Sequence, residues 1–313
     1  MDGTTPPAPP VRGKSRRRRL LVIAIPFLWL AVLFLAPFLM VAKISLSTTA
    51  IAIPPYEPTF DLSEGLAVFF DKLGQLSFDN YTFLLSDDLY LRAYLSSLTI
   101  AGVSTVLCLL AGYPIAYGMA RAPRTWRPLL FMAIILPFWT SFLIRVYAWI
   151  GILKKEGLLN QLLLWLGVIH EPLTILNTDV AVYIGILYAY LPFMVLPIYA
   201  SLEKQDETLL EAAADLGCPP AKAFWTITFP LSLPAVAAGA LLVFIPAVGE
   251  FVIPDLLGGS DTLMIGKTMW SEFFENRDWP VASAVAVVLL LILIVPIVLY
   301  RDREQRLEAR GER

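Results

Sequence analysis

Residues 20–42 read LLVIAIPFLWLAVLFLAPFLMVA, a run without a single charged residue. A helix needs about 20 apolar residues to cross the hydrocarbon core of a bilayer. An open strand cannot satisfy its backbone hydrogen bonds in lipid, so the run is predicted to be a transmembrane helix. It is also longer than the apolar core of a cleaved signal peptide, which has about 7–15 residues.

Five more apolar segments follow, and the composition agrees with a membrane protein. The chain is 58% hydrophobic and 16% charged, whereas soluble domains are about 45–50% apolar and about 25% charged. The sequence therefore predicts an all-α, polytopic membrane protein with six transmembrane helices. The six predicted spans are residues 20–42, 95–120, 129–153, 180–202, 231–254 and 281–300.

The distribution of Lys and Arg sets the orientation, because cytoplasmic loops carry an excess of these residues. With both termini in the cytoplasm (N-in/C-in), 16 of the 24 Lys and Arg residues lie inside and 7 lie outside. We expect a cytoplasmic basic tail (residues 1–19), a transmembrane domain (20–300) and a cytoplasmic tail (301–313). Within the domain, residues 43–94 form an external segment and residues 203–230 a cytoplasmic loop.

Several classes of function are excluded or disfavoured. A net charge of −2 argues against nucleic-acid binding, and one histidine makes a histidine-based metal site improbable. Gly266-Lys267-Thr268 resembles the end of a P-loop, but Asp261 stands where that motif needs its first glycine. We therefore expect no catalytic, metal or cofactor site on this chain. A stand-alone secondary transporter or channel for an organic cation remains the alternative, although no acidic residue lies near the centre of a span.

The cytoplasmic loop carries the most informative pattern. Residues 206–230 read DETLLEAAADLGCPPAKAFWTITFP. Acids in the first turn suit a short helix, Leu209, Ala213 and Leu216 share one face, and Gly217 permits a sharp reversal. Such a helical hairpin fits docking into a groove of a soluble partner. It equally fits an amphipathic loop that rests on the lipid headgroups, and the spacing leaves both readings open.

This loop resembles the "EAA" signature of binding-protein-dependent ABC importer permeases. The signature is EAA, three residues, G, nine residues, I, one residue, then LP. Phe229 replaces its leucine, and the matching residues are Glu211, Ala212, Ala213, Gly217, Ile227 and Pro230. The resemblance extends over the whole chain, and residues 138–149, 249–259 and 276–284 look like the polyamine branch, which carries putrescine or spermidine.

The resemblance implies a type I importer permease in the bacterial inner membrane, which is not itself an enzyme. Two ATPase subunits would bind ATP and Mg and dock on the EAA loop. A second permease subunit, identical or different, would complete the pathway, and an extracytoplasmic polyamine-binding protein would deliver the substrate. Glu211 and Gly217 would then transmit force during alternating access. Which polyamine is carried stays open.

A polyamine is a polycation, so carboxylates and aromatic faces are the groups expected to bind it. The outer loops carry 15 acids against 7 bases, although positive-inside sorting explains this excess without a cationic cargo. Arg145 and Glu250 lie in predicted spans near the outer surface. They either form a structural pair, reach the headgroups or line the pathway. The pathway candidates, whose aromatic members equally fit an interfacial belt, are Glu250, Asp255, Trp139, Tyr147, Arg145 and Trp270.

Overall fold

A computed structural model describes residues 14–60 and 66–309. Within this part, four helices are long and apolar enough to cross a bilayer: Val22–Ser45, Asp88–Arg121, Asp179–Glu203 and Pro220–Val248. The predicted all-helical, polytopic architecture is confirmed. Residues 1–13 of the predicted basic tail and residues 310–313 of the predicted C-terminal tail lie outside the described residues.

The first predicted span and the external segment after it consist of short elements. The span comprises α1 (Lys14–Leu30), the π-helical turn η1 (Ala31–Leu35) and α2 (Ala36–Ser45). Strand β1 (Thr48–Thr49) then pairs antiparallel with β2 (Tyr56–Glu57), with Thr48 opposite Glu57. Helices α3 (Leu66–Gly74) and α4 (Asp79–Ser86) lead into the first long helix of the bundle.

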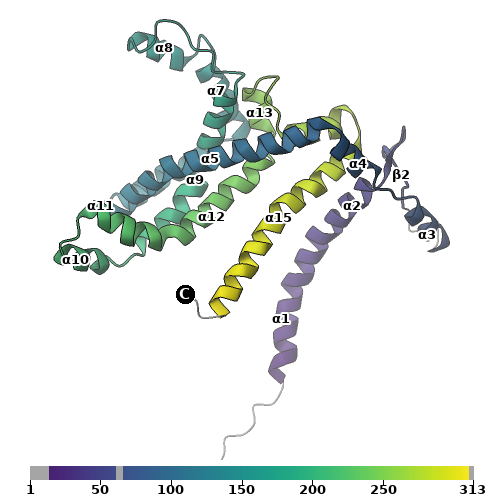
Figure 1. Cartoon of the computed structure of the whole chain (residues 1–313), viewed down its shortest axis with the longest axis horizontal. Helices are drawn as coiled ribbons and strands as arrows, with labels where there is room; N and C mark the ends of the chain where they lie inside the picture. The colour runs from purple at the N-terminus through teal and green to yellow at the C-terminus, as the bar shows by residue number, and fades with distance from the viewer. Residues whose placement is uncertain (1–13, 61–65, 310–313) are drawn as a thin grey trace, which may run out of the picture.

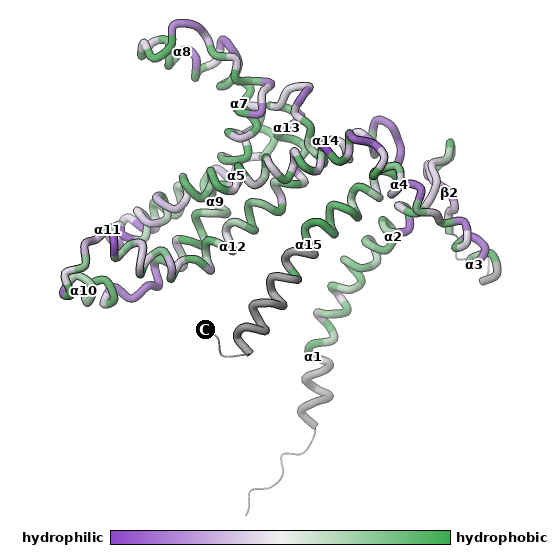
Figure 2. The backbone as a smooth tube through the Cα atoms, viewed as in Figure 1, coloured by the Kyte–Doolittle hydropathy of each residue, from purple (hydrophilic) through white to green (hydrophobic). Residues whose placement is uncertain are grey.

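Three long helices form the centre of the molecule. Helices α5 (Asp88–Arg121), α9 (Asp179–Glu203) and α12 (Phe229–Val248) pack side by side (Figure 1). Their shared core includes the fully buried side chains of Cys108, Met194 and Val243. Apolar residues dominate these helices, and polar residues gather at the ends and in the connections (Figure 2).

The last helix, α15 (Trp279–Ala309), packs against α2 and diverges from the three central helices (Figure 1). Its upper end is attached to α5 by a buried hydrogen bond of 2.8 Å, which the Tyr94 hydroxyl donates to the Val285 carbonyl. The sixth predicted span lies within α15, where the apolar helix Trp279–Ile294 is shorter than the four long helices.

The third predicted span, residues 129–153, is not the continuous helix that we expected. It consists of α6 (Arg127–Ile135), the 3₁₀ turn η2 (Leu136–Trp139) and α7 (Phe142–Leu153), followed by α8 (Leu158–Trp165). The axis bends by 93° between Trp139 and Phe142. Pro137 has no amide hydrogen to continue a helix, and Thr140 then adopts an extended conformation.

The fifth predicted span ends earlier than residue 254. Helix α12 ends at Val248, and a short non-helical segment leads from it to α13 (Val252–Leu257). Helix α14 (Ile265–Trp270) and the π-helical turn η4 (Ser271–Glu275) follow. A Cβ atom on Gly266 would lie 2.4 Å from the carbonyl oxygen of Gly249. Only a glycine therefore lets α14 approach the break, and Glu250 lies beyond the helix rather than inside it.

The loop that carries the EAA pattern lies at the end of the bundle where α9 ends and α12 begins. It forms α10 (Thr208–Asp215), α11 (Pro220–Ala223) and the π-helical turn η3 (Phe224–Thr228). In Figure 1 α10 and α11 lie at the left of the view, the start of α1 and the end of α15 lie in its lower part, α8 and α13 lie at the top and α3 lies at the right. The N-in/C-in prediction requires α10, α11, the start of α1 and the end of α15 to lie on one side of the membrane.

Candidate functional site

The first candidate site is the helical hairpin α10–α11 at the inner end of the bundle. Its first helix begins after Asp206, whose carboxylate accepts a 3.0 Å hydrogen bond from the backbone N–H of Thr208. This bond favours the charged form and lowers the pKa of Asp206. The carboxylate therefore stays charged at neutral pH, where it suits the positive end of the helix.

The reversal between the two short helices depends on Gly217, which has a φ of +75°. The N–H groups of Gly217 and Cys218 donate to the carbonyls of Ala214 and Ala213 at 2.8 and 2.9 Å. This is the Schellman pattern, in which a left-handed residue ends a helix and satisfies its last carbonyls. The role predicted for Gly217 from the sequence, a sharp reversal, is confirmed.

The apolar face predicted for this helix is only partly correct. Ala213 is buried, but Leu209 and Leu216 are exposed by 45% and 88%. Leu210, which is half-buried, and Ala214, which is exposed, line a small cavity of about 200 Å³ together with Phe224. Leu209 and Leu216 therefore lie on the outer surface of the hairpin.

The hairpin is fixed to the bundle by aromatic and polar contacts. The ring of Phe224 packs edge-on against Tyr113 and Tyr117, with centroids 5.6 and 5.7 Å apart. Gln205 donates a 3.1 Å hydrogen bond to the carbonyl of Thr228. Of the residues that match the EAA pattern, Glu211, Ala212, Gly217 and Pro230 are exposed, Ile227 is half-buried and Ala213 is buried.

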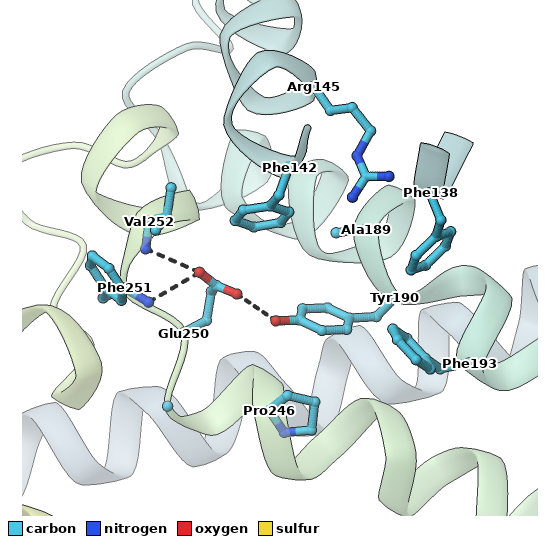
Figure 3. Close-up of a pocket in the computed structure, with 11 residues that line it drawn as sticks. Phe138, Phe142, Arg145, Ala189, Tyr190, Phe193, Pro246, Glu250, Phe251 and Val252 are labelled. Atoms are coloured by element: carbon cyan, nitrogen blue, oxygen red, sulfur yellow. Dashed lines mark hydrogen bonds between the residues drawn. The ribbon is translucent and has the colours of Figure 1, made fainter. Parts of the chain in front are cut away.

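The second candidate site is a cavity of about 470 Å³ at the two helix breaks (Figure 3). It lies between the break after η2, the middle of α9 and the break after α12. Aromatic rings form much of its wall, and it contains one carboxylate and one guanidinium. The lining residues are Phe138, Phe142, Arg145, Ala189, Tyr190, Phe193, Pro246, Gly249, Glu250, Phe251 and Val252.

Glu250 is held firmly in this cavity. One carboxylate oxygen accepts hydrogen bonds from the backbone N–H groups of Phe251 at 3.2 Å, Val252 at 3.0 Å and Ile253 at 3.4 Å. The other oxygen accepts a short hydrogen bond from the Tyr190 hydroxyl. The side chain thus caps the start of α13 and leaves the second oxygen beside the aromatic wall (Figure 3).

Arg145 faces the same cavity from α7. Its guanidinium carbon lies 5.1 Å from the ring centroid of Phe138 and 5.9 Å from that of Phe142. One terminal nitrogen, Nη1, donates to the carbonyl of Pro137 at the helix break. Arg145 and Glu250 are therefore brought to one cavity, but they do not form the ion pair that the structural interpretation of the sequence expected.

The other four pathway candidates do not line the cavity. Asp255 forms an ion pair with Lys267 at 3.5 Å, and Trp139 and Tyr147 are exposed by 74% and 58%. Trp270 stacks on Phe251 with centroids 4.4 Å apart, which places it behind one wall of the cavity.

The sequence analysis missed Tyr190 and Phe193 as site residues. Both belong to α9, and Tyr190 lies 60 residues before the carboxylate to which it donates. The one available signal was a tyrosine in the middle of an apolar helix, because a buried hydroxyl needs a hydrogen-bond partner.

The fold agrees with comparisons to known proteins. Residues 109–301 match the family model described as "Binding-protein-dependent transport system inner membrane component". The chain belongs to this family of ABC importer permeases, so it is a multi-pass inner-membrane subunit of a binding-protein-dependent transporter. ATP hydrolysis resides on separate subunits.

Individual relatives match most of the chain. It is 39% identical over 292 residues to the spermidine/putrescine transport system permease protein PotB of Haemophilus influenzae, covering 93% of this chain and 96% of the relative. It is 46% identical over 222 residues to PotB of Escherichia coli K12, covering 71% and 80%. A bacterial ABC transporter that imports alginate shares the fold, with a TM-score of 0.67 at 15% identity over 94% of this chain and 98% of that one.

Family membership settles the choice between the two classes of transporter. The chain is a permease that works with separate ATPases, and the stand-alone secondary transporter or channel is not supported.

Among the described residues, no group of three or more His, Cys, Asp or Glu side chains could hold a metal ion.

Proposed function

We propose that this chain is the permease subunit of an importer that moves spermidine or putrescine into the cytoplasm by alternating access. The similarity to two spermidine/putrescine permeases over most of their length supports this substrate class. The cavity supports it chemically, because a carboxylate beside aromatic rings attracts an organic ammonium ion through charge and cation–π contact.

The second oxygen of Glu250 is the group that would meet the amine. Its partner oxygen already accepts three backbone N–H groups, so the carboxylate cannot swing away to pair elsewhere. The Tyr190 hydroxyl donates its hydrogen to Glu250, which leaves the hydroxyl oxygen as a second acceptor for an ammonium group. Glu250 and Tyr190 together would bind one end of the substrate.

The ATPase subunits would dock on the hairpin α10–α11 and move it when they bind and hydrolyse ATP. Leu209 and Leu216 are exposed next to Glu211, which is the composition expected of a short helix that docks in a groove of a partner. Two ATPase subunits, a second permease subunit and a polyamine-binding protein would complete the complex. Glu211, Ala212, Ala213, Gly217, Ile227 and Pro230 would form the coupling segment.

Uptake into proteoliposomes tests this function. We expect vesicles that contain the complete complex, binding protein and ATP to accumulate labelled spermidine or putrescine. Vesicles that contain this chain alone should accumulate neither. Uptake by the chain alone under an ion gradient, or ATP-driven uptake of alginate fragments but not of polyamines, would contradict the proposal.

A further inference from the structure

The cavity contains two opposite charges that do not neutralise each other directly. Glu250 is 7% exposed and uses its oxygens for backbone N–H groups and the Tyr190 hydroxyl. Arg145 lies across the same cavity and forms no ion pair with any residue that the structure describes. In Figure 3 the guanidinium lies between Phe138 and Phe142, and the carboxylate faces Tyr190.

The environment of Arg145 is that of a bound cation. Its guanidinium contacts two aromatic rings, at 5.1 Å for Phe138 and 5.9 Å for Phe142. The Nε atom is buried and has no hydrogen-bond partner in the described structure. The bond from Nη1 to the Pro137 carbonyl therefore leaves Nε unpaired, although a buried unpaired donor is costly.

Resting on the function proposed above, we propose that Arg145 is a built-in competitor of the transported amine. In the empty cavity it supplies the positive charge that balances Glu250. An arriving ammonium group binds at Glu250 and Tyr190 and is repelled by the like charge of Arg145 in the same cavity. Arg145 thereby sets an upper limit on affinity, which a carrier needs because a substrate bound too tightly is not released.

The competing explanation is mechanical, because Nη1 of Arg145 donates to the carbonyl of Pro137 at the 93° bend. The two roles differ in what they require. Competition requires a positive charge at position 145. Fixing the bend requires the planar, multiple donors of a guanidinium, which lysine does not provide.

The test measures binding of tritiated putrescine to the complete complex in nanodiscs. We expect Arg145→Gln to bind putrescine about tenfold more tightly than the wild type and to turn over more slowly, so that KM and kcat for uptake both fall. Arg145→Lys should keep the wild-type affinity. Unchanged or weaker binding by Arg145→Gln at normal yield of folded complex would overturn the proposal.

A chemical variant controls for differences in folding. In an Arg145→Cys, Cys218→Ser chain the remaining cysteine, Cys108, is fully buried. Aminoethyl methanethiosulfonate would restore a positive charge at position 145 and should return the affinity to the wild-type value. Methyl methanethiosulfonate, which adds no charge, should leave binding tight.

Two other outcomes have definite meanings. If the Gln, Cys and Lys variants all fail to assemble, Arg145 supports the helix break through its guanidinium and the proposal is wrong. If the wild-type complex binds and transports no polyamine while its ATPase is active, the proposed function fails first. Normal polyamine transport with equal affinities in all variants would overturn only the role of Arg145.

Discussion

Glu250 shows how a single residue can end one helix, start another and present a charge. Its carboxylate accepts the first N–H groups of α13, which have no partner within that helix. The sequence identified Glu250 and Arg145 because ionisable residues in apolar segments are rare. It could not identify Tyr190, because nothing local relates a tyrosine in α9 to a carboxylate 60 residues later.

Replacing Glu250 by glutamine should reduce polyamine uptake about tenfold or more. The amide oxygen still accepts the backbone N–H groups, so α13 keeps its start, but the charged partner of the amine is lost, which costs about 1.5–3 kcal/mol. Labelled uptake by the complex, divided by the amount of folded complex, measures the effect. Glu156→Gln, at an exposed position, is the control, and an equal fall in uptake and folded yield would argue against a pathway role.

At the scale of elements, apolar runs predicted where helices are but not where they break. The runs around Cys108 and Met194 are long, and α5 and α9 are continuous as expected. The break after Val248 depends on a side-chain cap and on the approach of α14 to Gly249, which Gly266 permits. Such contacts join segments that are distant in the sequence, so hydropathy alone could not place the break.

Gly217→Pro should weaken retention of the ATPase subunits and leave membrane insertion intact. Proline fixes φ near −65°, whereas this position needs +75° and donates its N–H to Ala214. The hairpin would then lose its reversal. Co-purification of the ATPase with the membrane subunits measures the change. Gly118→Ala, where an added Cβ meets no atom within 4 Å, should behave like the wild type, and full retention in the proline variant would contradict the coupling role.

Tyr94→Phe should destabilise the attachment of α15 to α5 by about 1–3 kcal/mol, because the buried Val285 carbonyl would lose its donor. Thermal unfolding of the purified chain in detergent should show a lower midpoint. The same change at Tyr147, whose side chain is 58% exposed, serves as the comparison. Equal midpoints for the two variants would mean that this hydrogen bond does not stabilise the attachment.

At the scale of the whole molecule, the first span is the least covered part of the bundle. None of the most apolar window of Val22–Ser45 is buried within the chain, and α2 packs mainly against α15. The sequence predicted this helix and its orientation from hydropathy and basic residues. The sequence could not predict that this helix lies apart from the three central helices, because that position depends on packing rather than on composition.

The native cysteines give a direct test of orientation. Cys218 in the hairpin is half-buried and Cys108 is fully buried, so a membrane-impermeant maleimide should react with Cys218 alone. In vesicles that contain this chain without its partners, we expect labelling in inside-out but not in right-side-out preparations. Labelling of Cys218 from the outer side would refute the N-in/C-in topology.

Helix α12 starts one residue after η3 and the hairpin and ends two residues before Glu250. At about 1.5 Å per residue, its 20 residues form a rod about 30 Å long, close to the thickness of the hydrocarbon core. A tilt imposed at its inner end would displace its outer end to the extent that the helix stays straight at Pro234 and Pro246. One continuous helix therefore joins the proposed ATPase-docking hairpin to the proposed amine site, so a movement of the hairpin would reach Glu250 through α12 itself.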